Sequence, residues 1–534
     1  MTKTENTYDQ IPYPSLSYRQ SHPDRLATVA ILMGMHPAPV DRCRVLELGC
    51  ASGGNLAPMA YVLPNSEFVG IDNSQQQIAE GQREIESLGL KNIALKHLDI
   101  LDMDGSLGQF DYIIAHGVFS WVPHAVQEKL LDACKDSLTP NGVAFVSYNA
   151  YPGWHMIGII RDMMLYHTRD ETDPQQQATM ARQLLSFMAE ALSDKEDAYG
   201  SFINMYANFL QGELRGDIDS GNSVLLHDEL ETHNQPLYFW QFAERAAQHG
   251  LQYLGDAEFR TMMGSNLKPD VNKTLAQMSK SVIDIEQYMD FVRNRTLRQT
   301  LLCHQGIEVR RKLSPEQLFT FRASSHAKTD AMRDQVDVHS TSIERFRSND
   351  GATLATDHPV TKAAMLHLAE VWPRSVPFDE LLETATSLLG VKAGHAERKD
   401  AQMLGTNLLK AYSYSSQLIE LHTFEPHMVL DVSERPVASP TARLQAKKGK
   451  RVANLCHDRV SLDEVDRFLI QYLDGSHDQA ALVQRLKEGP VADGRLVLEQ
   501  EGEQVQKAEQ LHQILVNGVH ERLCWLAHAA LLVA

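Results

Sequence analysis

The sequence lacks any stretch of about 20 uninterrupted apolar residues, the length that a helix needs to cross a membrane. Its N-terminus, MTKTENTYDQ, is polar and lacks the apolar core of a secretory signal. Together these absences predict a cytoplasmic protein without a membrane span. At 534 residues the chain is too long for one hydrophobic core, and about three or four domains are expected.

Cysteine is sparse: the chain has six, with no CxxC pair and no metal-ligand spacing. A disulfide framework is therefore not expected, and free buried thiols in a reducing cytoplasm are the simplest interpretation. Histidines and carboxylates show no ligand spacing either, so no metal is predicted. The cysteines are Cys43, Cys50, Cys134, Cys303, Cys456 and Cys524.

Basic residues are the minority, with 50 Lys and Arg against 69 Asp and Glu and a formal net charge of −19. Non-specific nucleic-acid binding depends on neutralising phosphates with Lys and Arg, so the sequence argues against a nucleic-acid partner. A basic or lysine-bearing partner is compatible with this charge. The one basic run, PTARLQAKKGKRVANL at 440–455, is interpreted as a solvated loop, with contact to an acidic partner as the alternative.

A regular alternation of strands and helices is present over residues 43–148. Apolar strands are predicted at residues 45–48, 66–72, 92–100, 110–118 and 142–149. Helices are predicted at residues 55–63, 74–89 and 124–138, with Ser74 as an N-cap. This order predicts an α/β fold with a doubly wound sheet and a ligand crevice at the carboxyl ends of its strands.

The stretch VLELGCASGGN, residues 45–55, joins the first strand to the first helix through a turn of small residues. Without bulky side chains the turn lets a ligand approach the backbone, and the following helix N-terminus presents free N–H groups. The pattern is not the GxGxxG of a dinucleotide site, and the chain has no GxxxxGK[ST] phosphate loop.

Three carboxylates are predicted to converge on this crevice. Glu47 precedes the turn, Asp72 ends the second strand where a carboxylate reaches ribose hydroxyls, and Asp99 lies near the end of the third strand. No Lys or Arg lies in the turn to meet phosphates. This balance suits a ligand with hydroxyls, an amino group and a cationic centre, such as S-adenosyl-L-methionine, better than NAD or a nucleoside triphosphate.

The residues ELGCASG resemble motif I of the class I S-adenosylmethionine-dependent methyltransferases, usually E/DxGxGxG, with Ala51 at the middle glycine. This resemblance implies S-adenosyl-L-methionine as cofactor. A Rossmann-like sheet with another nucleotide or no ligand is the alternative. The resemblance implies a methionine side lined by Glu47, Gly49, Ala51, Gly53 and Asn55, a ribose side at Asp72 and Asn73, an adenine side at Asp99 and Ile100, and a wall from His116 to Trp121.

The segment before the sheet is predicted to start a helix, because Ser21, Pro23 and Asp24 form a capping-box-like pattern. In methyltransferases an N-terminal segment often folds over the cofactor. We therefore interpret Tyr18, His22 and Arg25 as lid residues, with a capped surface helix and packing tyrosines as the alternative.

Aromatic and amide residues follow the last predicted strand in SYNAYPGWH, residues 147–155. Such a rim suits a nitrogen nucleophile and its methyl-sulfonium partner, because aromatic faces favour cations. The stretch does not match the NPPY motif of amino-methylating enzymes, and an aromatic loop that packs the next helix is the alternative. The residues predicted to position the acceptor are Tyr148, Asn149 and Trp154, with Trp121, Tyr151 and His155 beside them and Tyr148 or His155 as a proton relay.

Longer stretches in order between about residues 8 and 304 resemble bacterial proteins in which a methyltransferase regulatory domain follows a class I domain, the rickettsial-type outer-membrane-protein lysine methyltransferases. The resemblance implies N-methylation of lysines on an unfolded outer-membrane or surface protein, and a homodimer. Within this range residues 168–214 predict helices, Pro236 a helix start, and 281–304 a further amphipathic helix. The matching stretches are QSHPDRL, CRVLELGCASGGN, SYNAYPGWH, LLHDEL, NQPLYF and FVRNRTLRQTLLCH.

The expected organisation is a Rossmann-like methyltransferase domain followed by mostly helical and winged-helix-like α+β domains. Winged helices often bind DNA, but the acidic chain argues otherwise. A small-molecule methyltransferase with lid and dimerisation domains is the alternative function, and a scaffold on a degenerate methyltransferase is disfavoured by the intact motif. The predicted domains are 1–167 with the lid, a connector at 168–224, the regulatory domain at 225–321, and winged-helix-like domains at 322–440 and 441–534.

Overall fold

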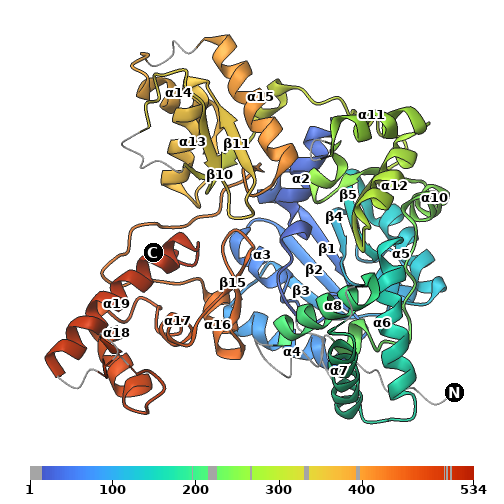
Figure 1. The fold of residues 1–534 in the computed structure, drawn as a ribbon, viewed down its shortest axis with the longest axis horizontal. Coiled ribbons are helices and arrows are strands. Elements are labelled where there is room, and N and C mark those ends of the chain that lie inside the picture. The colour runs from blue at the N-terminus through green and yellow to red at the C-terminus, as the bar shows by residue number, and fades with distance from the viewer. Residues whose placement is uncertain are drawn as a thin grey trace.

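A computed structural model gives the fold of the chain (Figure 1). Residues 195–196 and 215–224 of the predicted connector lie outside the described residues. The structure describes residues 15–194, 197–214, 225–264, 267–329, 336–392, 397–497, 499–500, 503–504 and 508–534.

A seven-stranded sheet with the order β3-β2-β1-β4-β5-β7-β6 forms the centre of the molecule. Its first five strands are parallel, and β7 and β6 complete it as antiparallel strands. The predicted α/β fold is confirmed, with strand ends shifted by a few residues. The strands are β1 (Arg44–Leu48), β2 (Glu67–Asp72), β3 (Ile93–His97), β4 (Phe110–Ala115), β5 (Leu138–Asn149), β6 (Leu251–Asp256) and β7 (Leu297–His304).

The last two strands correct the interpretation of residues 281–304 as one amphipathic helix. Helix α12 (Val282–Arg293) ends where Asn294 adopts a left-handed conformation with φ of 48°. The next residues then pair with β5 and β6, and Leu301, Leu302 and Cys303 are fully buried. Partners on both sides decide the conformation of this apolar run, which periodicity alone does not reveal.

Helices cover both faces of the sheet. On one face α2 (Pro23–Leu32), α3 (Leu56–Val62) and α4 (Gln75–Leu88) share one hydrophobic core, and on the other α5 (His124–Ser137) and α10 (Phe239–Gln248) share a second. The Ser74 N-cap is confirmed, because its side chain accepts the Gln77 N–H.

The start of α2 differs from the predicted one in its cap. Pro23 occupies the first turn as expected, but the N-cap is His22, whose Nδ1 accepts the Asp24 N–H at 3.2 Å. Ser21 belongs instead to the short 3-10 helix η1 (Arg19–Ser21), where its hydroxyl donates to the Tyr18 carbonyl.

A helical unit stands beside the sheet (Figure 1) and confirms the helices predicted over residues 168–214. It consists of α6 (Gly153–Thr168), α7 (Pro174–Ala191) and α8 (Ala198–Leu214), which share their own core. Helix α6 begins directly after β5, so the rim of the crevice is anchored to this unit. A further helix, α11 (Pro269–Met278), precedes α12.

The middle part of the chain contains two three-stranded sheets packed with three helices. Residues 322–352, predicted as a strand pair or an exposed linker, contribute three of these strands. The elements are β8 (Arg322–Ser324), β9 (Lys328–Thr329), β10 (Glu344–Arg347), β11 (Thr353–Thr356), α13 (Pro359–Val371), β12 (Val376–Pro377), α14 (Phe378–Leu388), α15 (Arg398–Tyr414) and β13 (Glu420–His422).

The C-terminal part has a separate hydrophobic core. Gly475, with φ of 82°, lies between α17 and α18, as the predicted helix break requires. Its elements are α16 (Pro440–Lys448), β14 (Arg451–Ala453), β15 (Arg459–Ser461), α17 (Glu464–Ile470), α18 (Gln479–Leu486), β16 (Glu499–Gln500), β17 (Glu503–Gln504) and α19 (Ala508–His528).

The predicted solvated loop at residues 440–455 instead forms α16 and β14, and its basic residues meet acids of the same chain. Lys448 Nζ lies 2.6 Å from Glu80 Oε1 on α4 and also pairs with Glu84. Lys450 pairs with Glu464 at 3.0 Å. Among the described residues no helix has the length and apolarity that crossing a membrane requires.

Candidate active site

The turn after β1 has an unusual backbone. Gly49 and Gly53 adopt positive φ angles of 75° and 77°, and Ala51 one of 50°. A Cβ at Gly49 would overlap the Cγ2 atom of Val118, so only glycine fits there. The Ala51 N–H donates to Asp72 Oδ2 at 2.8 Å, which fixes the strained turn against the end of β2.

Glu47 is the buried carboxyl group just before this turn, with 4% of its surface exposed. Its Oε1 accepts from Asn55 Nδ2 at 2.7 Å, but Oε2 has no hydrogen-bond partner in the part of the chain that the structure describes. Burial raises the pKa of the Glu47 carboxyl to about 8, with the Asn55 hydrogen bond opposing and the charge of Asp72 adding to the rise. An orphaned buried carboxylate oxygen fits a ligand that brings an ammonium group.

The other predicted cofactor residues lie at the carboxyl ends of β2 and β3, which are parallel neighbours. Asp72 Oδ1 accepts the Ser74 N–H at 2.8 Å, and Asn73 beside it is exposed. Asp99 Oδ1 accepts the Leu101 N–H at 2.9 Å, and Ile100 is buried. These residues therefore share one edge of the sheet with Glu47, as the parallel register requires.

His116, after β4, forms a wall of the same crevice. Its Nδ1 lies 2.9 Å from Ser147 Oγ, and its ring centroid lies 3.8 Å from that of Tyr18. Burial lowers the pKa of His116 to about 3, with the charge of Arg459 adding to the effect. The wall is therefore an uncharged, oriented ring at neutral pH.

A strap formed by residues 15–21 crosses the glycine turn. The Gly54 N–H donates to Ser15 Oγ at 2.7 Å, and a Cβ on Gly54 would overlap the Ser15 carbonyl. The Tyr18 N–H donates to Asn55 Oδ1 at 2.9 Å. Of the three predicted lid residues, Tyr18 thus lies in the crevice.

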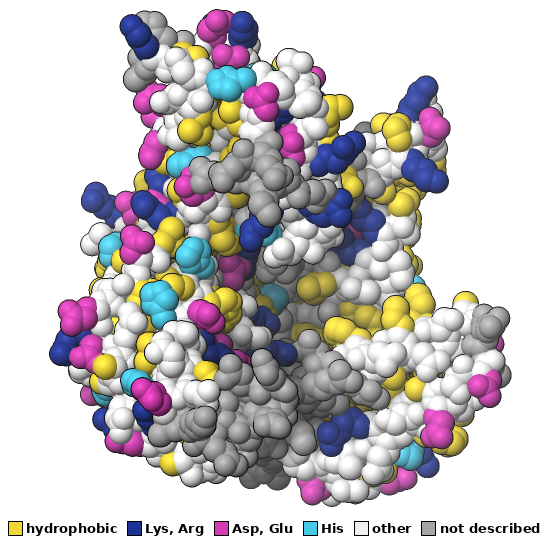
Figure 2. Space-filling model, turned by 60° about the vertical axis from the view of Figure 1, so that its left-hand side comes forward, with side chains coloured by type: hydrophobic (Ala, Val, Ile, Leu, Met, Phe, Trp, Pro, Cys, Tyr) yellow, Lys and Arg dark blue, Asp and Glu magenta, His cyan; other side chains and the backbone are white. Residues whose placement is uncertain are grey.

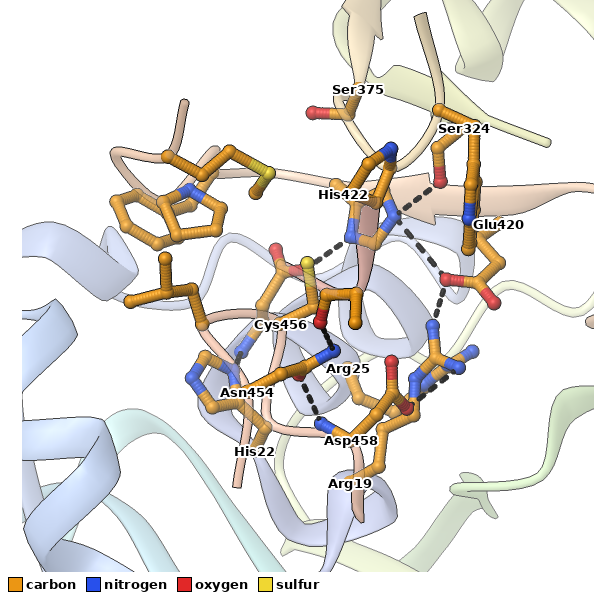
Figure 3. A pocket seen from close by; sticks show the side chains of 18 of the residues that line it. Arg19, His22, Arg25, Ser324, Ser375, Glu420, His422, Asn454, Cys456 and Asp458 are labelled. Carbon is orange, nitrogen blue, oxygen red and sulfur yellow. Dashed lines mark hydrogen bonds and ion pairs between the residues drawn. The ribbon is translucent and has the colours of Figure 1, made fainter. Parts of the chain in front are cut away.

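The other two predicted lid residues, His22 and Arg25, line a second cavity of about 160 Å³ between the strap, the middle part and the C-terminal part (Figure 3). Asp24 pairs there with His422 at 2.9 Å. Arg19 meets Glu420 and, at 3.0 Å, Asp458. Figure 3 shows these ion pairs bridging the segments, so the charged groups of this cavity largely satisfy one another.

An aromatic rim follows β4 and β5, which are the parallel neighbours of β1 in the sheet. The rings of Tyr151 and His155 stack at 4.0 Å, and His155 Nε2 lies 3.2 Å from the Tyr238 hydroxyl. Trp121 and Trp154 meet edge to face at 5.9 Å.

Two predicted acceptor residues at the end of β5 have different surroundings. Asn149 donates from Nδ2 to Asn234 Oδ1 at 3.0 Å beside the rim. Tyr148 instead stacks on Phe242 at 4.1 Å, and its hydroxyl lies 3.1 Å from Thr300 Oγ1. Successive strand residues face opposite sides, so the structure places Tyr148 in the core rather than on the rim.

Burial raises the pKa of Tyr148 far above its usual range, with the charge of Arg298 and the Thr300 hydrogen bond opposing the rise. A hydroxyl that is buried and this reluctant to ionise does not suit a proton relay. Of the two predicted relay residues, the exposed His155 is the one that the structure leaves at the rim.

Four residues of the site were missed by the sequence analysis. Asn234 and Tyr238 belong to a stretch that was noted only for its resemblance. His457 Nε2 lies 2.9 Å from Asn55 Oδ1, and Arg459 packs over the Tyr18 ring. Asn234 and Tyr238 lie 85 and 83 positions from their partners Asn149 and His155, and His457 lies 402 positions from Asn55. At such separations no local pattern signals contact.

Family comparisons agree with this architecture. Residues 46–144 match the family described as "Methyltransferase domain", and residues 221–304 match "Predicted methyltransferase regulatory domain". Residues 434–531 match "PKMT, C-terminal winged helix domain". The fold, the glycine turn and these matches define an S-adenosylmethionine-dependent methyltransferase, and the predicted C-terminal winged helix is confirmed.

Full-length comparisons identify the family within this class. An uncharacterized protein of Rickettsia prowazekii is 34% identical over 516 residues, which cover 96% of this chain and 90% of that protein. Two structures of PKMT2 from Rickettsia typhi cover 98% of this chain and 100% of their own, one with a TM-score of 0.83 at 30% identity and one, in complex with AdoHcy, with 0.86 at 29% identity. The chain belongs to the PKMT family of methyltransferases.

Proposed function

We propose that the protein N-methylates lysine side chains of a bacterial outer-membrane or surface protein, using S-adenosyl-L-methionine. The single observation that carries the proposal is that an orphaned carboxylate oxygen after β1 and an aromatic rim after β4 and β5 share the carboxyl end of one parallel sheet. Support for a protein acceptor comes from the match to the "PKMT" winged-helix family and from the full-length likeness to PKMT2 from Rickettsia typhi.

The cofactor side follows from the chemistry of the residues present. Glu47 Oε2 would accept from the methionine ammonium, and the small residues Gly49, Ala51 and Gly53 would let the ligand lie against the backbone. Asp72 would accept from the ribose hydroxyls and Asp99 would orient the adenine. When bound, S-adenosylmethionine supplies an activated methyl group.

The acceptor side must handle an amine that is mostly protonated in water. A free lysine has a pKa of about 10.4, so deprotonation at pH 7 costs about 4.6 kcal/mol. Trp121, Trp154 and Tyr151 offer an apolar, aromatic surface, and desolvation there favours the neutral amine. Positioning is then the main task of the chain, with His155 placed at the rim to receive a proton.

The outer shape favours a polypeptide acceptor. Figure 2 shows one face of the molecule hollowed between its parts, with hydrophobic side chains gathered along one wall. An open, partly apolar hollow suits an extended chain, whereas metabolites are usually enclosed in pockets of a few hundred Å³. An unfolded membrane protein would present both lysines and apolar segments to such a surface.

The test incubates the protein with labelled S-adenosylmethionine and urea-solubilised outer-membrane proteins of its host, followed by mass spectrometry of the label. Glu47→Gln is the variant expected to be inactive. Glu67→Gln is the matched control, because Glu67 is an exposed carboxylate on β2 that pairs with Arg44 on β1. Label on lysines with the wild type and the control, but not with Glu47→Gln, supports the proposal. Label only in a metabolite extract would overturn it in favour of a small-molecule acceptor.

A further inference from the structure

A loop of the C-terminal domain reaches the cofactor side of the crevice. The loop connects β14 to β15 and carries His457, which is 2% exposed. His457 Nε2 lies 2.9 Å from Asn55 Oδ1, and its ring lies 5.2 Å from that of His22. Asn55 belongs to the glycine turn, so the C-terminal domain contacts the very residue that holds Glu47.

Arg459 makes a second contact just past this loop. Its Nε donates to the Ser17 carbonyl at 2.6 Å, and its guanidinium lies 4.3 Å from the centre of the Tyr18 ring. The strap is therefore held from both sides, by Arg459 outside and by Gly54 and Asn55 beneath. A guanidinium over a tyrosine face is attractive and resists displacement by water.

The hydrogen bonds at Asn55 explain why the loop matters to the cofactor. Asn55 Oδ1 accepts from the Tyr18 N–H and faces His457 Nε2, while Nδ2 donates to Glu47 Oε1. Burial holds the pKa of His457 well below its usual value, so its ring is neutral. Because the amide oxygen of Asn55 can only accept, Nε2 is the ring nitrogen that carries the hydrogen. These contacts fix which end of the Asn55 amide faces Glu47, and thereby the orientation of the carboxylate.

The backbone of His457 gives independent support. It adopts a left-handed φ of 66°, which a residue with a Cβ adopts only at some cost. Asp458 beside it pairs with Arg19 of the strap at 3.0 Å. The loop is thus shaped to contact the N-terminal segment, rather than merely covering it.

We propose that the C-terminal winged-helix domain is a structural part of the cofactor site. His457 and Arg459 act as positioning residues that hold the strap and Asn55, so that Glu47 is presented to the methionine end of the ligand. The inference concerns cofactor binding alone and holds whatever the methyl acceptor is. It also gives this winged helix a role in contacting the cofactor-binding part of the same chain, rather than in binding nucleic acid.

The test measures S-adenosylhomocysteine binding by calorimetry in the full-length protein. His457→Gly removes the imidazole without penalising the left-handed backbone, and Arg459→Met removes the cation while keeping an apolar chain. We expect either change to raise the dissociation constant about five- to tenfold. His457→Gln, which retains an N–H donor, should recover most of the affinity.

Arg467→Met is the matched control, because Arg467 lies in the same domain and donates to the Ala446 carbonyl at 2.8 Å. It should leave the dissociation constant unchanged. A second readout is hydrogen exchange of the Tyr18 and Gly54 amides in the ligand-free protein, which should accelerate in His457→Gly and Arg459→Met. Thermal unfolding checks that each variant is folded.

Two results would overturn the inference. One is unchanged affinity and unchanged exchange in both site variants while they remain folded. The other is an equal loss of affinity in Arg467→Met, which would mean that general stability of the domain, and not these contacts, sets cofactor binding.

Discussion

The two sides of the crevice are built in different ways. The cofactor side gathers buried, oriented polar groups on the ends of adjacent parallel strands, with Glu47 at its centre. The side proposed for the acceptor is an aromatic rim assembled from η4 (Phe119–Trp121), the start of α6 and the segment before α10. Under the proposed function, we expect one side to hold the cofactor and the other to receive a larger and more variable partner.

This difference shows where binding energy and chemistry are expected to separate. We expect charge-assisted hydrogen bonds on the cofactor side to set the affinity for the ligand, because Glu47 Oε2 has no other partner among the described residues. Under the proposed function, we expect the aromatic surface of the rim to orient and desolvate the acceptor, and thereby to change turnover instead. Variants on the two sides should therefore affect different measured constants.

The largest effect is expected at Glu47. Replacing it with Gln keeps the size and the Asn55 contact but removes the charge that meets the ammonium, so S-adenosylhomocysteine should bind about 100-fold more weakly, equal to about 2.7 kcal/mol. Calorimetry measures this loss. Thermal unfolding without ligand should show no destabilisation, because burial disfavours the charge that the variant removes. Affinity within threefold of the wild type would contradict the claim that the Glu47 carboxylate dominates cofactor binding.

The same contrast explains what the sequence could reveal. Glu47, Asp72 and Asp99 each belong to or follow an apolar strand pattern that the sequence shows directly. Because parallel strands bring their carboxyl ends together, the common location of these three carboxylates could be predicted. Tyr148 was misplaced because one position along a strand reverses the face of its side chain.

The long-range part of the fold was hidden for another reason. The sequence of β7 is compatible with a helix, and its pairing with β5 and β6 makes it a strand. His457 contacts Asn55 only because the C-terminal domain packs against the N-terminal part of the chain. Such contacts depend on tertiary packing, which leaves no periodic signal in the residues themselves.

The next largest effect is expected at the rim, where the variant His155→Ala should lower turnover. This side chain is exposed, so its removal should cost little stability, but it ends the stacking on Tyr151 and the contact with Tyr238. We expect turnover with a protein acceptor to fall about tenfold while S-adenosylhomocysteine affinity stays unchanged. His124→Ala, an exposed histidine at the start of α5, is the control. A parallel loss of cofactor affinity would show that the two sides are not independent.

The pH dependence of cofactor binding should be smaller but diagnostic. Burial raises the pKa of Glu47 to about 8, so the carboxyl is mostly protonated at pH 7, and the ligand ammonium must drive out its proton. Affinity should therefore rise with pH, about fivefold from pH 7 to pH 8, and then flatten. Calorimetry at pH 7 in buffers of different ionisation enthalpy should detect the released proton. A flat profile in the wild type would contradict the prediction, and an equal rise with pH in Glu47→Gln would assign the pH dependence to another group.

The smallest effect is expected at Lys448, which sharpens the comparison within the C-terminal domain. Lys448 pairs with Glu80 and Glu84 on α4, but its side chain is 48% exposed, so water and salt screen these pairs. Lys448→Ala should change S-adenosylhomocysteine affinity less than twofold and the free energy of unfolding by at most about 1 kcal/mol. The buried hydrogen bond of His457 to Asn55 and the partly buried one of Arg459 to the Ser17 carbonyl also join the C-terminal domain to the N-terminal part, and they are expected to matter several times more. If loss of the exposed Lys448 ion pairs weakened affinity as much as loss of His457, cofactor binding would depend on the overall packing of the C-terminal domain against the sheet. A negligible effect beside a clear loss at His457 would instead mean that the coupling runs through Asn55 and the strap.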